Sequence, residues 1–211
     1  MKSSIYRFSL ILAVCFLASC ASSTKKMDEG FAMRPFQEET LPNGLRLLVI
    51  RDNSLPRVSL QMMVNSGALY DAKDKAGLTA LTYSLLDKGT DKKSAPQLAD
   101  AFAQIGAEFA VQPGADFSMI NVSSIAPSKD EMLALYFEVL TKANFSAKEI
   151  ERQRAQHIAA LQKAKDRPDS YTDKVFDEVL FENHPYGIPG LGTPEGLKKI
   201  KRQDLVASYQ A

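Results

Sequence analysis

The chain has 211 residues, of which 45% are hydrophobic and 24% charged, an ordinary composition for a globular protein with one sizeable domain or two small ones. Lysine and arginine number 26 against 25 acidic residues, so the net charge is only +1. Because no basic patch stands out, the charge pattern gives no support to nucleic-acid binding.

The N-terminus has the pattern of a targeting segment. Two basic residues, Lys2 and Arg7, precede an apolar stretch at 8–17 that is too short for a comfortable transmembrane span. The stretch runs into the sequence L-A-S-C, which ends at Cys20 and resembles the lipobox of bacterial lipoproteins. This resemblance implies cleavage before Cys20 and a lipid on its thiol. The alternative is a plain secretory signal without a lipid.

The residues that follow Cys20 extend this prediction to a location. Ala21 and Ser22 resemble the outer-membrane sorting signal of enteric-type bacteria. We therefore expect a lipid-anchored protein in the cell envelope of a Gram-negative-type bacterium, in the outer membrane and facing the periplasm. Loss of the signal peptide, residues 1–19, also removes Cys15, so no internal disulfide is expected. Residues 20–35 are polar and patternless and are predicted to be a flexible tether before a domain at 36–211.

The first part of the domain is predicted to be rich in strands. Segments 36–40 and 45–51 read as a β-hairpin, whose Asn43-Gly44 pair would supply the positive φ angles of a tight turn. A further strand is expected at 58–64. Residues 77–88 are predicted to be helical, because leucines recur there on one face at positions 78, 81 and 85.

The rest of the domain alternates one more hairpin with several helices. Ser94 is placed to cap a helix that stops at Gly106, and strands are expected at 108–112 and 117–123. Helices are then predicted at 129–142, at 147–165 after a Ser146 cap, and from Pro168 to about 181, followed by two short helical stretches. The helix at 129–142 would bury Met132, Leu133, Tyr136, Phe137 and Leu140. This order predicts an α+β fold with a mostly antiparallel sheet and helices packed on one face.

One motif is more specific than these patterns. Residues 77–90 read G-L-T-A-L-T-Y-S-L-L-D-K-G-T. They resemble the zinc-binding helix of the insulinase/pitrilysin peptidases, whose consensus is roughly G-L-A-H-F-L-E-H-x-L-F-K-G-T. Ala80, Tyr83 and Ser84 stand where that family has His, Glu and His. The surrounding positions match at Gly77, Leu78, Leu81, Leu86, Lys88, Gly89 and Thr90.

Other segments match the same family in order, so that the resemblance covers about residues 36–210. They are L-P-N-G-L at 41–45, the strand end at 64–70, a hairpin at 106–118, the helix pattern at 150–169 and the H-P-Y-G loop that begins at His184. The resemblance implies one half-unit of the insulinase/pitrilysin fold, the fold of mitochondrial processing peptidase. It also implies that the domain is incomplete at its C-terminal end, because the family continues there into another strand and a second half.

The family's chemistry depends on residues that this chain lacks. Two His four apart on a helix can share a zinc ion, and the intervening Glu activates the zinc-bound water as a general base. The resemblance places the third ligand, a Glu in the family, at Ala160, or at Leu161 if the alignment shifts by one. Alanine has no lone pair for zinc, and neutral Ser or Tyr hydroxyls are poor ligands. We therefore expect no catalytic residue, no metal ligand and no zinc cofactor.

Two histidines and a glycine-rich loop are the other candidate sites in the sequence. His157 lies one helical turn before Ala160 and could face the same cleft, but it lacks a second ligand, so a structural or solvent-facing histidine is the favoured interpretation. His184 is expected to have a structural role in its loop. Residues 187–192 are rich in glycine and proline but lack the lysine of a phosphate-binding loop.

The resemblance thus predicts a non-catalytic member of the family, acting as a partner subunit or as a peptide-binding module. Its partner would be a homologous zinc-bearing peptidase subunit or a second, self-pairing half. The family binds extended peptides by adding them to a strand edge. Two alternatives stay open: an active zinc endopeptidase whose metal site is supplied by a partner chain, and a truncated, non-functional fragment. The peptide-binding strand edge of the family corresponds in this chain to Glu108, Phe109, Ala110, Val111 and Gln112.

Overall fold

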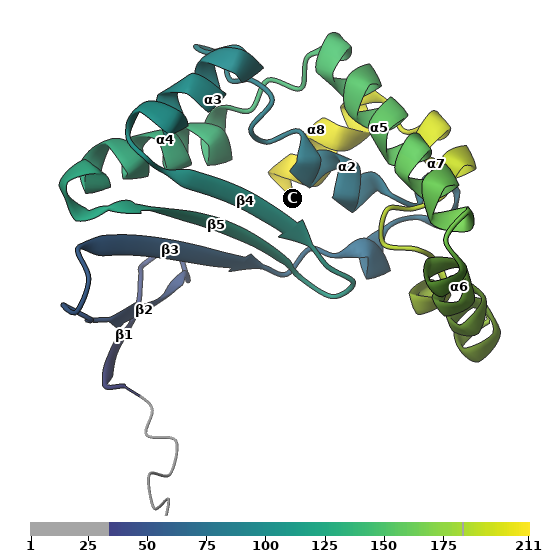
Figure 1. Cartoon of the computed structure of the whole chain (residues 1–211), viewed down its shortest axis with the longest axis horizontal. Coiled ribbons are helices and arrows are strands. Elements are labelled where there is room, and N and C mark those ends of the chain that lie inside the picture. Colours follow the sequence, from purple (N-terminus) through teal and green to yellow (C-terminus); the bar gives the residue numbers. More distant parts are fainter. Residues whose placement is uncertain (1–33, 183) are drawn as a thin grey trace, which may run out of the picture. The chain divides into compact units, whose positions relative to one another are not determined.

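The structure is a computed structural model that describes residues 34–182 and 184–211 (Figure 1). The chain forms two compact units, Met1–Asn53 and Ser54–Ala211, and each is described by itself. The predicted signal peptide, Cys20 and nearly all of the predicted tether lie outside the described residues. Within the described ranges, no helix combines the length and the hydrophobicity that a membrane crossing requires.

The first unit contains the expected hairpin. Strands β1 (Phe36–Thr40) and β2 (Arg46–Ile50) pair antiparallel, with Thr40 opposite Arg46. The prediction of two positive φ angles in the turn is wrong, because only Gly44 has one, at 84°. Asn43 acts through its side chain instead, since its Oδ1 accepts a hydrogen bond from the Leu45 amide at 3.1 Å. A glycine in the left-handed conformation at the end of a three-residue loop is a common way to close a hairpin.

The second unit holds a three-stranded antiparallel sheet in the order β3-β5-β4. Strand β3 (Arg57–Val64) and strand β4 (Glu108–Pro113) both pair with the central strand β5 (Ser118–Ile125). The predicted strands are therefore confirmed to within two residues. Strands β3 and β4 each have one edge that no other strand of the described residues pairs with.

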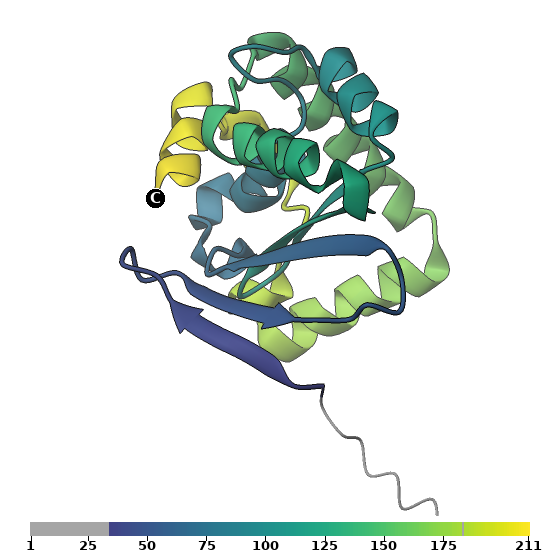
Figure 2. The ribbon, with the colours of Figure 1, turned by 90° about the vertical axis from the view of Figure 1, so that its left-hand side faces the viewer.

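Helices cover one face of this sheet, as the sequence predicted. Side chains of β5 alternate, and Ile120 and Val122 point into the core. Helices α3 (Ala95–Gln104) and α4 (Lys129–Lys142) lie over that face (Figures 1 and 2). The Phe102 ring of α3 stacks on Phe109 of β4 with 5.5 Å between ring centroids. The α+β fold with a mostly antiparallel sheet is thereby confirmed.

The helix boundaries agree with the sequence patterns where strong capping residues are present. Gln97 Oε1 accepts from the Ser94 amide at 2.9 Å at the start of α3, and the Glu149 amide donates to Ser146 Oγ at the start of α5. Besides α3 and α4, the helices are α2 (Leu78–Ser84), α5 (Ala147–Lys165), α6 (Pro168–Phe181), α7 (Pro194–Lys199) and α8 (Arg202–Gln210). Short 3₁₀ segments lie at Ala68–Tyr70, Lys73–Lys75, Ala126–Ser128 and Pro185–Gly187.

Two expectations about helices are wrong. Helix α2 ends at Ser84 and not at 88, because the next amides bond three residues back: Leu85 to Thr82 and Leu86 to Tyr83. Such bonds tighten the last turn and end the helix. Phe137 was expected to be buried but is 50% exposed. The buried stripe of α4 follows Met132, Tyr136 and Val139 instead.

Candidate functional site

The site that the sequence singled out begins with the short helix α2, and the half-buried carboxylate of Asp71 binds the start of this helix. Asp71 accepts hydrogen bonds from the Gly77 amide at 2.9 Å, the Thr79 amide at 3.0 Å and Thr79 Oγ1 at 2.7 Å. Burial raises the pKa of Asp71, although these hydrogen bonds lower it. A carboxylate in this position satisfies amides that the first turn of a helix leaves free.

Two glycines fix where α2 starts relative to a distant loop. Gly77 has φ of 100°, and a Cβ there would lie 2.6 Å from the Leu191 carbonyl oxygen. A Cβ on Gly192 would lie 2.2 Å from the Ala76 carbonyl oxygen. The glycine-rich loop at 187–192 thus serves to bring two stretches of backbone into contact. Both glycines belong to the family pattern, and their positions explain why a side chain cannot replace them.

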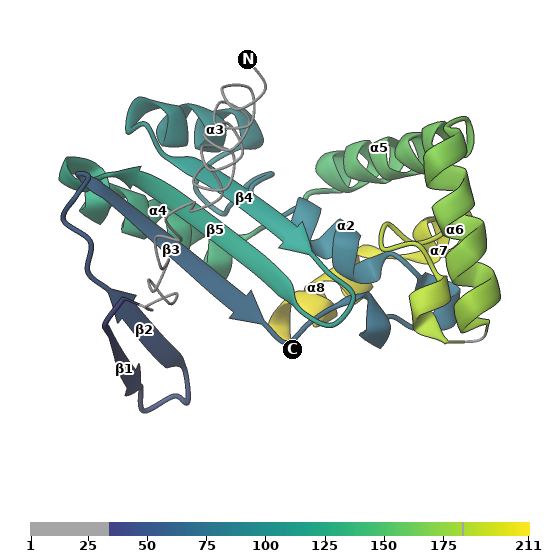
Figure 3. The ribbon, with the colours of Figure 1, turned by 60° about the horizontal axis from the view of Figure 1, so that its bottom comes forward.

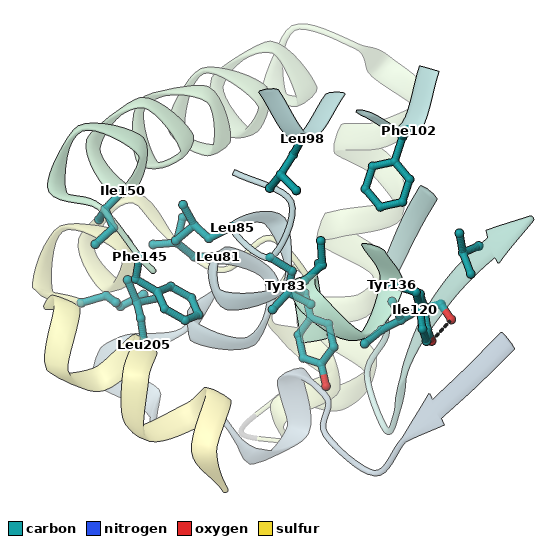
Figure 4. Close-up of a cluster of buried hydrophobic side chains, with 14 of the residues drawn as sticks. Leu81, Tyr83, Leu85, Leu98, Phe102, Ile120, Tyr136, Phe145, Ile150 and Leu205 are labelled. Atoms are coloured by element: carbon teal, nitrogen blue, oxygen red, sulfur yellow. Dashed lines mark hydrogen bonds between the residues drawn. The ribbon is translucent and has the colours of Figure 1, made fainter. Parts of the chain in front are cut away.

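The three altered positions of the motif lie in different environments on α2. Ala80 is 2% exposed and Tyr83 is 7% exposed, so both are part of the buried interior. Tyr83 belongs to the same buried hydrophobic cluster as Leu81 and Leu85, although its ring points away from both (Figure 4). Ser84 is half-buried, and its hydroxyl donates to the Leu81 carbonyl at 2.8 Å. Ser84 lines an open cavity that neither Ala80 nor Tyr83 lines.

Helix α5 supplies the facing wall, but not with the residue that the resemblance indicated. Ala160 is exposed, and Leu161 packs against the core and lines a separate pocket beside α6. The residues of α5 that share a cavity with Ser84 are Arg152, Gln153 and Gln156. The sequence analysis did not single out these glutamines. The signal that could have found them is their spacing: Gln153 lies about two turns and Gln156 about one turn before the predicted ligand position, on the same side of the helix.

The cavity has a volume of about 340 Å³ and lies where α2, α5 and β4 meet. Figure 3 shows β4 at one edge of the sheet, with the end of the strand directed towards α2 and α5. Phe109, Ala110 and Val111 of β4 line it together with the residues of α5 and with Ser84, Asp87 and Lys88. The predicted edge strand is therefore adjacent to the altered motif. Glu108 and Gln112 lie on the same strand but do not line the cavity.

The basic residues around the cavity form ion pairs with neighbouring carboxylates. Lys88 Nζ lies 2.7 Å from Asp87 Oδ2, and Arg152 Nη2 lies 2.6 Å from Glu149 Oε2. The remaining polar groups of the wall, those of Ser84, Gln153 and Gln156, are uncharged. The cavity consequently combines uncharged hydrogen-bonding groups with Asp87, Lys88 and Arg152, whose charges are balanced by ion pairs.

His184 takes the structural role that the sequence favoured, whereas His157 is neither solvent-facing nor hydrogen-bonded through Nδ1 to the described residues. His157 is half-buried, its Nδ1 has no partner among the described residues, and burial lowers its pKa. It does not line the cavity. His184 Nδ1 accepts a hydrogen bond from the Tyr186 amide at 3.3 Å within its own loop. In the described part of the chain, no group of three or more His, Cys, Asp and Glu could hold a metal.

The donor set at the motif does not fit zinc. A methyl group stands at two of the four family positions, Ala80 and Ala160. Ser84 already donates its hydroxyl proton to a backbone carbonyl, and Tyr83 lies in the apolar core. Zinc in proteins requires thiolate, imidazole or carboxylate ligands in a tetrahedral arrangement, and none of these positions supplies one.

Comparison with known proteins agrees with this architecture. A profile of the insulinase family, peptidase family M16, matches residues 46–194. An uncharacterized zinc protease of Rickettsia bellii is 23% identical over 171 residues, which is 81% of this chain and 42% of that protein. A non-peptidase homolog, YmxG, of Helicobacter pylori is 26% identical over 155 residues, 74% of this chain and 36% of that protein.

Two further matches bear on fold and assembly. A probable mitochondrial-processing peptidase subunit beta of Arabidopsis thaliana is 21% identical over 166 residues, 79% of this chain and 31% of that protein. A crystal structure of a peptidase M16 inactive domain from Pseudomonas fluorescens superposes with a TM-score of 0.79 at 23% identity, covering 83% of this chain and 43% of that one. The chain spans about two fifths of the length of the first curated relatives that it matches. Because the family profile matches well over half of its length, the chain belongs to the insulinase family of peptidases, family M16.

Proposed function

We propose that this chain is a non-catalytic member of the insulinase family that binds extended peptides, alone or as the partner of a homologous subunit. The observation that carries the proposal is the loss of every group that would bind or use zinc. Ala80, Tyr83, Ser84 and Ala160 occupy the four positions, and the first two are packed into the interior. A single loss could be repaired by a neighbouring residue, but four losses leave no chelating group.

Peptide binding does not depend on the metal, and the parts that it needs are present. Strand β4 ends the sheet, so one of its edges presents backbone N–H and C=O groups that no other described strand pairs with. An extended peptide can add to such an edge through main-chain hydrogen bonds. The cavity of about 340 Å³ beside Phe109 to Val111 gives its side chains a place to lie.

The proposal includes a partner and a location. A homologous zinc-bearing peptidase subunit, or a second half that pairs with this one, would complete the cleft. Support comes from the matched relative that is named as a subunit. The lipobox-like sequence that ends at Cys20 supports a lipid anchor in the cell envelope.

The test is to purify the full chain from membranes in detergent, with and without proteins that accompany it, and to measure zinc and peptide cleavage. We expect the isolated chain to carry far less than one zinc per molecule and to show no chelator-sensitive cleavage. A zinc-bearing homologue that copurifies, and whose cleavage weakens when this chain is removed, would place this chain in a partner role. One zinc per isolated chain together with chelator-sensitive hydrolysis would overturn the proposal.

A further inference from the structure

Gln153 lies in α5, faces the cavity and is unusually buried for a glutamine. It is only 6% exposed, which is rare for a glutamine. Its amide forms no hydrogen bond with any of the described residues. A buried amide without a partner costs free energy, so its retention needs a physical reason.

The position of the amide supplies that reason. Gln153 lines the cavity of about 340 Å³ between α2, α5 and β4. It is not among the fully enclosed polar atoms that lack a partner, which belong to Thr82, Asn121, Arg154 and His157. The remaining exposure of Gln153 therefore lets its polar end reach the cavity.

The other polar groups of the cavity make it selective. The Ser84 hydroxyl donates its hydrogen bond to the Leu81 carbonyl, so its oxygen remains available only as an acceptor. Gln153 can both donate and accept. Lys88 and Arg152 are each paired with a neighbouring carboxylate, so the cavity wall has no unbalanced positive charge that would favour an anionic ligand. A ligand group that both donates and accepts, and carries no charge, fits this arrangement.

The strand edge delivers such a group to the cavity. Side chains of a β-strand alternate between the two faces of a sheet, so every second side chain of a peptide added along β4 points to the helix-covered face. Phe109 and Val111, on that face of β4, line the cavity. One peptide side chain in the matching register would enter it.

We propose that the cavity is a specificity pocket for an amide side chain, asparagine or glutamine, of an extended peptide bound along β4. This inference rests on the proposed peptide-binding function. In the pocket, the ligand amide pairs with the Gln153 amide and donates to Ser84 Oγ. The altered motif thereby contributes a hydrogen-bond acceptor for recognition at a position where its relatives have a metal ligand.

The experiment uses the full chain in detergent and fluorescein-labelled nonapeptides of the host sequence Lys-Thr-Val-Thr-X-Thr-Val-Thr-Lys. The guest X is glutamine, leucine or glutamate, and binding is followed by fluorescence anisotropy. We expect the glutamine peptide to bind about tenfold more tightly than either of the others, because each alternative leaves the pocket's polar groups unpaired. Hydrogen exchange of residues 107–113 is measured in the same samples, and bound peptide should slow it while leaving β3 unchanged.

Two matched variants separate the pocket from the strand. Leucine has nearly the same volume as glutamine. In Gln153→Leu, we expect the leucine peptide still to bind, and the affinities for the glutamine and leucine peptides to become about equal. Gln162→Leu, at an exposed position of the same helix, should leave the preference unchanged. If peptides bind and protect β4 but all guests bind equally in the wild-type chain, the pocket proposal is wrong and the peptide-binding function stands. If no peptide binds, or β4 is not protected, both are wrong.

Discussion

Two tyrosines show how differently a hydroxyl can be used in the same core. Tyr136 is fully buried, and its hydroxyl donates to the Ile120 carbonyl oxygen at 3.1 Å (Figure 4). Burial raises the pKa of Tyr136 to about 12, so the hydroxyl stays protonated and remains a donor. Tyr83, at the family's catalytic position, is almost as buried, but its hydroxyl has no hydrogen bond to the described residues. Its ring fills space, and the residue is therefore expected to act through packing alone.

This contrast gives a prediction for a pair of identical substitutions. Tyr136→Phe should lower the free energy of unfolding by about 1 kcal/mol, because a buried hydrogen bond is lost. Tyr83→Phe should change it by less than about 0.5 kcal/mol, because no hydrogen bond is removed. Urea denaturation of the two variants measures both values. A larger loss for Tyr83→Phe would show that its hydroxyl has a role that the structure does not reveal.

At the scale of elements, α2 depends on a close backbone contact more than on its own length. The helix has seven residues, too few to be stable alone, and most of its side chains are buried. Gly77 stands at its start with a positive φ and lies against the 191–192 backbone. The motif therefore has a glycine that sets the position of the helix, while Ala80, Tyr83 and Ser84 stand on that helix where the family has His, Glu and His.

Alanine substitution of two glycines tests this contact. Gly77→Ala combines a positive φ with a Cβ 2.6 Å from a carbonyl oxygen, so the loop or the helix must move. Gly106 also has a positive φ, of 60°, but a Cβ there meets nothing within 4 Å. We expect Gly106→Ala to cost about 1 kcal/mol and Gly77→Ala at least about 2 kcal/mol more. Equal losses in thermal or urea unfolding would argue against the close contact.

In the whole second unit, ion pairs join segments that are far apart in the sequence. Lys93 Nζ lies 2.7 Å from Glu138 Oε2, and Thr90 Oγ1 donates to Glu138 Oε1 at 2.7 Å. Lys75 Nζ lies 2.7 Å from Asp204 Oδ1, which ties α8 to the segment before α2. Burial opposes the charge of Glu138, yet the hydrogen bonds from Lys93 and Thr90 hold its pKa below the usual value. The hydrogen bond from Lys75 lowers the pKa of Asp204 in the same way.

The lowered pKa of Glu138 predicts how stability depends on pH. A carboxyl group with a lower pKa in the folded state stabilises the fold above its unfolded pKa, and this contribution is lost as the pH falls through the folded pKa. The difference in unfolding free energy between the wild type and Glu138→Gln should therefore be greatest near neutral pH. It should shrink below the usual value of 4.5 and vanish at lower pH. Urea titrations at several pH values measure this difference.

A control and a contrary outcome complete the test. Glu131→Gln, on the exposed side of the same helix, should give a much smaller difference at neutral pH, because Glu131 has no ion pair in the described structure. A Glu138→Gln effect that stays constant from neutral to acid pH would mean that the carboxylate charge is not the source of the stabilisation.

The sequence by itself determined the local elements and the residue types at the motif positions. Leucine spacing, the Ser94 and Ser146 caps and the glycine turns are set by contacts within a few residues, and the structure places strands and helices where these patterns predicted them. The identities of Ala80 and Ser84 likewise need no coordinates to exclude them as good zinc ligands.

Only the tertiary structure decided which residues meet at the site. Packing against the core ended α2 early, left Phe137 exposed and placed Gln153, instead of Ala160, in the cavity with Ser84. These outcomes depend on how α2, α5 and β4 pack, and such contacts join residues far apart in the chain. A local sequence pattern does not predict a cavity, because the cavity walls are formed by residues far apart in the chain whose shapes and volumes determine how they pack.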